Sequence, residues 1–354
     1  MSKSKLTLLV DGNWLLMSRL SVFGSRYLED NELCNELQLL MVRSIGVVLK
    51  QFPEIDSVIV CADGGSWRTK VDIPSCLHHE EKGTDAEYKG TRVRSDDINW
   101  DMIFTSYEEL LSLFEQYGIT ACREKDIEGD DWIYHWSNYL NENNTNVIIW
   151  SKDNDLKQLV KMNNDKCFTF WWNKDSGFIT PKYEDDNISF MFNMSYNENE
   201  DIINNLQKHC PKFTQINPKE IIIDKILKGD SSDNILPVIL RNSKSSNSDR
   251  KFKISSKDID YDLDWNNKEE VTNFITNIAN SKNYAGRCID TIPDMIEHFD
   301  YNRQLIVLED KSYPESIKEI FNEHKEYFIS KDISQLESYL IASSNKIRGI
   351  LDII

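Results

Sequence analysis

Acidic residues gather in the chain where buried strands would end and where one helix would begin. Within the stretch 127–160, three acids precede an apolar pattern with helical spacing, and two follow directly on the apolar run 147–150. These residues are Glu128, Asp130, Asp131, Asp153 and Asp155. Because open α/β sheets place their ligand sites at the carboxyl ends of strands, we expect these carboxylates to converge on one site.

A cluster of this kind indicates metal binding. A single acid at a helix start can simply cap the helix, which stabilises it by roughly 0.3–1 kcal/mol. Two carboxylates about 5 Å apart, however, repel each other by roughly 3 kcal/mol at an effective dielectric of about 20. Converging acids therefore need cations, protons or water, and all-oxygen ligands suit Mg²⁺ or Mn²⁺ better than zinc.

Further acids occupy similar places elsewhere in the chain. Asp11 and Asp63 each follow a short apolar run that is typical of a buried strand, and Asp230 and Asp233 lie on a predicted tight turn after a helical pattern. Taken with the first group, these are too many ligands for one ion, and they suit two. We expect two Mg²⁺ ions, for which Mn²⁺ can substitute, because a metal pair can activate water for attack on a phosphodiester.

Strands and helices alternate in the part of the chain that would hold these acids. Apolar runs predict buried strands at 6–10, 57–62, 119–122 and 147–150, and helical spacing is found at 14–20, 33–48, 107–117 and 133–140. The sequence therefore predicts an α/β fold, with a central, mostly parallel sheet flanked by helices and a hairpin at 167–179, up to residue 185. From residue 186 to 354 we expect a C-terminal helical region, with helices at 221–227, 271–278, 292–298 and 317–328.

Composition limits the class of protein. The 354 residues carry 41 basic and 59 acidic side chains, a net charge of −18, which argues against a general nucleic-acid coating protein but permits a local basic groove. The seven cysteines are scattered, as in a cytoplasmic protein with reduced thiols, and no His/Cys spacing fits zinc. No apolar run approaches the ~18 residues of a membrane span. We expect a cytoplasmic monomer without membrane contact, in the host cytoplasm if the protein is viral.

Two basic segments could contact nucleic acid. In the segment 66–97, which reads as a charged helix or a loop, Lys89 and Arg92 are three positions apart and would share a face if the segment is helical, and aromatic residues lie between the charges. The polar segment 241–257 reads as a loop that meets backbone phosphates or as a plain surface insertion. The candidate nucleic-acid-binding residues of the two segments are Arg68, Tyr88, Arg94, Arg241, Lys244, Lys251 and Lys253.

Several short motifs in a fixed order resemble those of a known family. They are Asp11-Gly12-Asn13, Asp63 with Ser66-Trp67-Arg68, Tyr88-Lys89-Gly90-Thr91-Arg92, Glu128-Gly129-Asp130-Asp131, Ser151 to Asp155 with Gln158-Leu159, and Gly229 to Ile235. Each motif is weak alone, but their order over residues 8 to 240 resembles the flap endonuclease or 5′-3′ exonuclease family. The likeness is strongest to the bacteriophage ribonuclease H members, and the fold of this family is 5′-nuclease or PIN-like.

The resemblance implies roles for the acids and for the basic pair. Asp11, Asp63, Glu128 and Asp130 would hold the first metal ion, whereas Asp131, Asp153, Asp155, Asp230 and Asp233 would serve or bridge the second. Lys89 and Arg92 would be catalytic residues on an arch or gateway near 66–97. A helix-hairpin-helix-like element near 220–260 would grip duplex DNA, but the glycines that approach phosphate or a monovalent ion are replaced here.

The resemblance also implies an activity and partners. The protein would be a Mg²⁺-dependent 5′-3′ exonuclease or flap endonuclease with ribonuclease H activity, which removes RNA primers or flaps during DNA replication. Its partners would be DNA with a 5′ flap or nick, an RNA-DNA hybrid, and a single-strand DNA-binding protein or other replication proteins. The alternatives are a PIN-type RNA endonuclease, a phosphatase that uses Asp153-Asn154-Asp155, and a non-catalytic nucleic-acid-binding protein of the same fold.

Overall fold

The computed structural model describes residues 5–23, 30–77, 87–92, 95–117, 119–163, 167–182, 200–243, 251–325 and 336–342. By its internal contacts the chain divides into two compact units. The first unit comprises residues 1–66, 95–216 and 313–354, and the second comprises residues 67–94 and 217–312. The predicted division into two domains at residue 185 stays a prediction.

A mixed, mostly parallel sheet forms the centre of the first unit. Within the described residues its strands are β1 (Lys5–Asp11), β2 (Ser57–Cys61), β3 (Thr120–Cys122), β4 (Thr145–Trp150), β5 (Lys161–Asn163), β6 (Cys167–Asn173), β7 (Gly177–Pro181) and β8 (Phe213–Ile216). The order is β3-β2-β1-β4-β6-β7-β8, with β5 paired to β6. Only the β5–β6 and β6–β7 pairs among these are antiparallel. The predicted fold class is confirmed.

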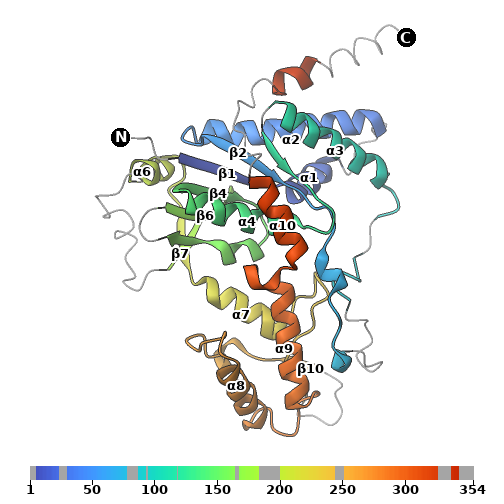
Figure 1. Ribbon diagram of the computed structural model, residues 1–354, viewed down its shortest axis with the longest axis vertical. Coiled ribbons are helices and arrows are strands. Elements are labelled where there is room, and N and C mark those ends of the chain that lie inside the picture. The colour runs from blue at the N-terminus through green and yellow to red at the C-terminus, as the bar shows by residue number, and fades with distance from the viewer. Residues whose placement is uncertain are drawn as a thin grey trace. The chain divides into compact units, whose positions relative to one another are not determined.

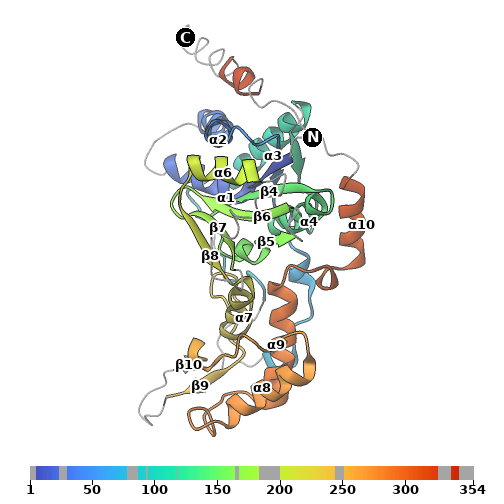
Figure 2. The same cartoon turned by 90° about the vertical axis from the view of Figure 1, so that its left-hand side faces the viewer.

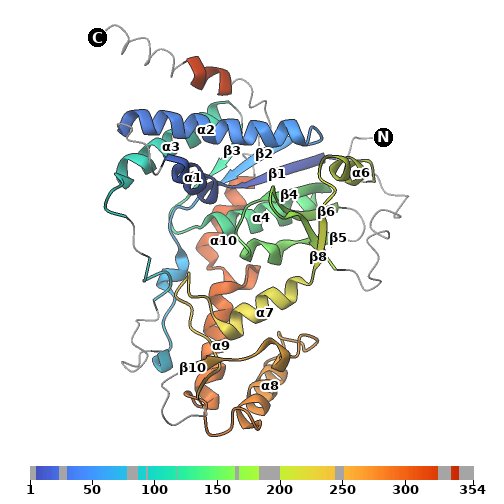
Figure 3. The same ribbon diagram turned by 180° about the vertical axis from the view of Figure 1, so that it is seen from behind.

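Helices cover both faces of this sheet. Their bounds are α1 (Gly12–Leu20), η1 (Ser21–Phe23), α2 (Asp30–Gln51), α3 (Trp100–Gln116), α4 (Gly129–Glu142), η5 (Asp155–Leu159), α6 (Glu200–His209) and α10 (Glu315–His324). Helices α1, α2 and α3 lie on one face (Figure 3), and their apolar residues share a buried cluster with β1 and β2. Helix α4 lies on the other face, and α10 packs on α4 (Figure 1), where the ring of Phe321 is 5.2 Å from that of Trp132.

The second unit has its own core. Its elements are η2 (Trp67–Lys70), η3 (Ser75–Leu77), α7 (Pro218–Lys228), β9 (Leu240–Asn242), β10 (Lys251–Lys253), η6 (Ser256–Asp258), α8 (Lys268–Asn280), α9 (Ile292–Ile306) and η7 (Asp310–Ser312). Helix α8 packs against α9 (Figure 2), and apolar residues of α7, α8 and α9 form one buried cluster. Among the helices of the described ranges, none is both long and apolar enough to cross a membrane.

Two details differ from the expected elements. The segment predicted as a loop at 241–257 contains an antiparallel pair, β9–β10, in which Phe252 lies opposite Arg241. Strand β8 falls in the region expected to be helical and extends the main sheet by pairing with β7. These strands have only three or four residues, which is too short for an apolar alternation to stand out in the sequence.

Asn141 fixes the end of α4 to the sheet. This side chain is only 2% exposed. Its Nδ2 donates to the carbonyl oxygens of Thr145 at 3.0 Å and Phe168 at 3.3 Å, and its Oδ1 accepts from the hydroxyl of Thr169 at 2.9 Å. Because α4 also carries three of the candidate acids at its start, this anchor helps to set their position.

Removing this anchor should destabilise the protein. We expect Asn141→Ala to lower the free energy of unfolding by about 2–4 kcal/mol, because it leaves buried polar groups without partners. The control is Asn143→Ala, since Asn143 is exposed and bonds only within its own helix end, to the carbonyl of Tyr139. Urea unfolding measures both, and equal losses in the two variants would contradict the assigned role.

Candidate metal centre

The carboxyl ends of three parallel strands meet at one edge of the sheet. In the strand register, Asp11 of β1 lies beside Cys61 of β2, and Val10 lies beside Trp150 of β4. Each strand therefore ends within a residue or two of its neighbours, so the acids that follow the strands lie at the same edge of the sheet, and their role as metal ligands stays a prediction.

Hydrogen bonds between the segments that follow the strands tie these ends to one another. The backbone N–H of Asp63 donates to Asn13 Oδ1 at 3.1 Å. The hydroxyl of Ser151 donates to Asp11 Oδ2 at 2.6 Å and accepts from the backbone N–H of Asp153 at 2.8 Å. The sequence reasoning gave Asn13 and Ser151 no role. Their position directly beside the acids at the strand exits was the signal that could have identified them.

Asp11 is the buried centre of this group. It is 6% exposed, and its Oδ1 accepts the N-cap hydrogen bond from the backbone of Trp14 at 2.9 Å. Burial raises the pKa of Asp11 from 3.8 to about 7 despite its two hydrogen bonds, and the negative charges of Asp63 and Asp153 add to the rise. The site thus holds a carboxylate whose ionisation is opposed by its surroundings, a condition that a bound divalent cation reverses.

The start of α4 supplies the next acids. The backbone N–H of Gly129 donates to Asp63 Oδ1 at 2.6 Å. A Cβ at this position would lie 3.1 Å from that same oxygen, so glycine permits the close approach. Glu128 and Asp131 form a reciprocal capping box, in which Asp131 Oδ2 accepts from the Glu128 backbone at 3.1 Å. Asp131 is fully buried, and this bond assigns it to holding the helix start, whereas Asp130 is partly exposed.

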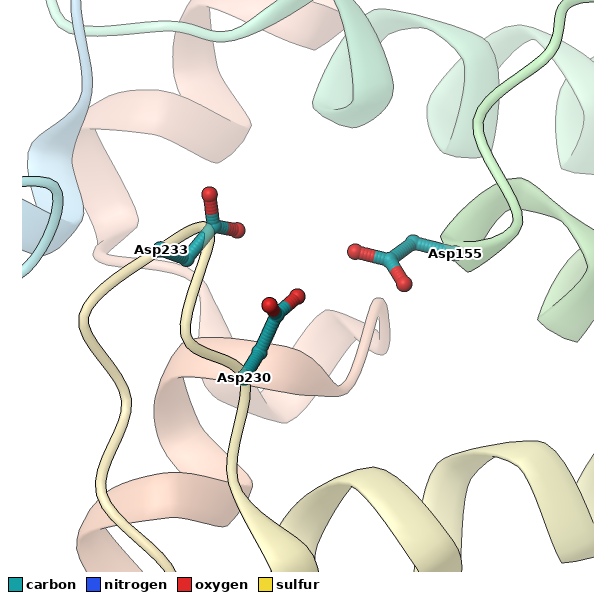
Figure 4. Close-up of side chains that lie close together, drawn as sticks. All are labelled: Asp155, Asp230 and Asp233. Atoms are coloured by element: carbon teal, nitrogen blue, oxygen red, sulfur yellow. The ribbon is translucent and has the colours of Figure 1, made fainter. Parts of the chain in front are cut away.

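The loop after β4 presents Asp153 to solvent. Asp153 Oδ1 accepts from the backbone N–H of Asp155 at 2.9 Å, and its carbonyl accepts from the indole of Trp171 at 3.0 Å. Asp155 is the first residue of η5 and is half-buried; Figure 4 shows its carboxylate on this turn. The loop is therefore held in shape while the Asp153 side chain stays exposed.

The acids of the second unit have basic partners. Asp230 and Asp233 project from the turn after α7 (Figure 4), and Lys225 Nζ lies 2.7 Å from Asp230 Oδ2. Burial alone would raise the pKa of Asp230, but the hydrogen bonds from Lys225 and Ser232 and the charge of Lys225 lower it to about 2. This carboxylate is thus already compensated by a cation of the protein.

The predicted basic pair is bound to the same turn. The backbone N–H of Lys89 donates to the carbonyl of Asp233 at 2.8 Å, and Arg92 donates to Asp233 Oδ1 at 2.5 Å. The amide of Asn234 donates to the carbonyl of Glu87 at 2.9 Å, so the segment 87–92 is anchored at both ends. The Arg92 side chain is 54% exposed, and the Lys89 ammonium lies 5.1 Å from the Tyr88 ring centroid.

The other candidate nucleic-acid-binding residues differ in accessibility. Arg68 is 3% exposed and donates to the carbonyl of Leu305 at 2.8 Å, and Tyr88 is 7% exposed within the second core. These two positions give the predicted contact with nucleic acid no support. The guanidinium of Arg241 lies over the rings of Phe252 and Tyr284 at 5.7 and 4.7 Å. Lys251 and Lys253 are exposed, and Arg94 and Lys244 lie outside the described residues.

Two curated relatives share part of this sequence. A 5′-3′ exonuclease of Mycoplasmopsis pulmonis is 26% identical over 237 residues, which cover 66% of this chain and 62% of that protein. A 5′-3′ exonuclease of Mycoplasma pneumoniae is 27% identical over 150 residues, 42% of each chain. The chain therefore spans less than two thirds of the length of either relative. No protein-family model matches the chain.

Solved structures of the phage T5 enzyme share the fold over almost the whole chain. The T5 D15 protein crystallised with metal ions has a TM-score of 0.51 and 16% identity, covering 96% of this chain and 99% of that one. The T5 5′-exonuclease with bound zinc has a TM-score of 0.52 and 15% identity, with coverages of 92% and 100%. At this identity the likeness shows the fold alone.

The chain shares its fold with the T5 5′-exonuclease structures. The relatives and the T5 structures confirm the resemblance to the flap endonuclease and 5′-3′ exonuclease family. The finer likeness to bacteriophage ribonuclease H stays a prediction, as do the roles of the individual site residues.

The raised pKa of Asp11 predicts a pH-dependent stability. Because its pKa of about 7 in the fold lies above the ordinary 3.8, the native state loses stability as pH rises between those values. Asp11→Asn keeps the acceptor for the Trp14 amide and removes the charge. Without divalent cations, we expect it to exceed the wild type in unfolding free energy by up to about 4 kcal/mol at about pH 8, with little difference near pH 4.

Urea unfolding in EDTA across this pH range measures the effect. The control is Asp97→Asn, which removes one charge from an exposed residue and should leave the pH dependence unchanged. If the free energies of unfolding of the wild type and of Asp11→Asn changed with pH in parallel, ionisation of the buried carboxyl group would not destabilise the fold.

Proposed function

We propose that the chain is a Mg²⁺-dependent 5′-3′ nuclease, an exonuclease or flap endonuclease with ribonuclease H activity, that removes RNA primers or flaps during DNA replication. The observation that carries this proposal is the group of carboxylates at the strand exits, in which Asp11 is buried beside Asp63 and Asp153. Two similar proteins named 5′-3′ exonuclease support it. So does the T5 D15 flap endonuclease in complex with DNA and metal ions, which has a TM-score of 0.51.

The donor set of the first unit fits divalent metal ions. All its candidate ligands are carboxylates, which suit Mg²⁺ or Mn²⁺, and the raised pKa of Asp11 marks a place where positive charge is lacking. In this proposal, Asp11, Asp63, Glu128 and Asp130 hold one ion, and Asp153 and Asp155 hold the other. Asp131 positions Glu128 through the capping box. Asp230 and Asp233 pair with Lys225 and Arg92, and their role as metal ligands stays a prediction.

The chain's own groups would prepare this site for substrate. Bound ions supply an activated water and neutralise charge on the attacked phosphate. The amides of Trp14 and Gly129 and the hydroxyl of Ser151 hold the carboxylates of Asp11 and Asp63 in fixed orientations. Such preorganisation lowers the reorganisation needed during the reaction.

Lys89 and Arg92 would contact phosphates of the substrate. The Arg92 guanidinium is exposed and pairs with a single carboxylate oxygen, so it can exchange Asp233 for a phosphate and bind it in a bidentate way. The Lys89 ammonium, which lies by the ring of Tyr88, acts as a point charge. The backbone of Lys89 remains bonded to the turn, which keeps the segment in place during this exchange.

Removing one exposed carboxylate should separate chemistry from binding. We expect Asp153→Asn to reduce cleavage of a 5′-labelled flap and of an RNA-DNA hybrid by at least about 100-fold in Mg²⁺, while affinity for the same DNA changes by less than about threefold. Asp97→Asn, an equal charge change on an exposed loop, is the control and should match the wild type. Product gels and fluorescence anisotropy measure the two quantities.

Different outcomes would favour other functions. Wild-type protein that releases no short 5′ products from either substrate, yet binds both, would support the non-catalytic alternative. Hydrolysis of free phosphate monoesters alone would support the phosphatase. Loss of DNA binding in Asp153→Asn with unchanged turnover would contradict the role given to Asp153.

The hairpin β9–β10 provides a test of duplex binding. Lys251 and Lys253 are both exposed and would lie on the same face of β10, since side chains alternate along a strand. We expect the double variant Lys251→Ala with Lys253→Ala to weaken duplex affinity and to reduce the slope of log K against log salt by about 2. Lys268→Ala with Lys282→Ala, also exposed in the second unit, is the matched control. Equal salt slopes in the two double variants would remove the hairpin from the DNA-binding surface.

A further inference from the structure

Tyr107 of α3 has a buried hydroxyl that the fold does not use. Its side chain is 2% exposed, and its Oη has no hydrogen-bond partner among the described residues. Buried hydroxyls in native proteins are nearly always bonded, and one that is not calls for an explanation. A packing role alone is better served by phenylalanine, which has the same ring without a polar atom.

The hydroxyl points to the group of acids at the strand exits. A Cβ placed on Gly12, the residue after Asp11, would lie 2.2 Å from Tyr107 Oη. Glycine at this position therefore makes room for the hydroxyl at the end of β1. Burial, followed by the charges of Asp63 and Asp11, raises the pKa of Tyr107 well above 10, so the group keeps its proton and remains a hydrogen-bond donor.

We take Asp63 as the acceptor of this hydroxyl. Asp11 already accepts two hydrogen bonds, from Trp14 and Ser151, through its two oxygens. Asp63 Oδ1 accepts from Gly129, and Asp63 exerts the larger of the two carboxylate effects on Tyr107.

We propose that Tyr107 is a positioning residue of the metal centre, whose hydroxyl donates to the Asp63 carboxylate when a divalent cation draws that carboxylate into place. This inference rests on the proposed function, because it requires a divalent cation at the strand exits. The cation-free protein carries an unbonded buried hydroxyl, and the cation-bound protein gains the missing hydrogen bond. Part of the cation affinity therefore comes from a residue that does not touch the cation.

Tyr107→Phe in the full chain tests this inference. Without divalent cations, the variant should be at least as stable as the wild type, because it loses only an unbonded polar atom. In a titration with MgCl₂ followed by thermal unfolding and by calorimetry, the concentration for half-saturation should rise about five- to tenfold, which is the value of one hydrogen bond. Tyr117→Phe, at the end of the same helix, is the matched control and should change neither quantity.

Activity provides a second reading of the same effect. The variant should need about five- to tenfold more Mg²⁺ for half-maximal cleavage and should recover most of its kcat at saturating Mg²⁺. A residue that only supports packing would lower stability without moving the Mg²⁺ requirement.

A second variant tests the same hydroxyl by adding a methyl group next to it, at Gly12. In Gly12→Ala, the new methyl would lie 2.2 Å from Tyr107 Oη and 2.8 Å from the backbone carbonyl oxygen of Cys61. The contact with the hydroxyl should raise the half-saturating Mg²⁺ concentration, and this part of the effect should be lost in a Tyr107→Phe background, whereas the contact with Cys61 is the same in both backgrounds. An unchanged Mg²⁺ midpoint in Tyr107→Phe, with Mg²⁺ still binding to the wild type, would overturn the role of Tyr107 alone. If MgCl₂ changed neither the thermal stability of the wild type nor its calorimetric binding heat, both the metal centre and this inference would be overturned.

Discussion

Burial of a carboxylate at one edge of a parallel sheet, to which the charges of neighbouring carboxylates add, is the constraint on which the site depends. The register of β1, β2 and β4 ends three strands together, and the residues that follow are acids. Backbone amides and the Ser151 hydroxyl then hold Asp11 and Asp63 in place, although burial and charge oppose the ionisation of Asp11. A fold that fixes such groups in this way is less stable in its ionised form unless positive charge is supplied from outside the chain.

The chain treats its two sets of acids differently. In the second unit, Lys225 and Arg92 compensate Asp230 and Asp233, and the pKa of Asp230 falls to about 2. At the strand exits of the first unit, the pKa of Asp11 rises to about 7. Sequence alone could not separate these cases, because both sets appear as acids at the ends of regular elements. The structure adds the basic partners of Asp230 and Asp233, and the role of these two acids as metal ligands stays a prediction.

The parts of the fold that sequence could predict are those with a strong local pattern. Strands β1, β2 and β4 are buried throughout, so each appears as an uninterrupted apolar run. Strands β9 and β10 carry Leu-Arg-Asn and Lys-Phe-Lys, which have no such run, and they were expected to be loop. Arg68 looked like a surface charge because nothing local indicates that the carbonyl of Leu305 accepts its hydrogen bond. The sequence indicates only that Tyr107 belongs to a helix. The surroundings of its hydroxyl depend on Gly12, which is distant in sequence.

The most direct test of the account is the side-chain titration of Asp11, followed by carbon NMR of the labelled carboxyl group with and without Mg²⁺. The account predicts a pKa of about 7 in the cation-free protein and a large downward shift when Mg²⁺ binds. A carboxyl group that titrates near its ordinary value of 3.8 in both conditions would contradict it, because ionisation of Asp11 would then be unopposed and its charge would not need a metal ion to stabilise it.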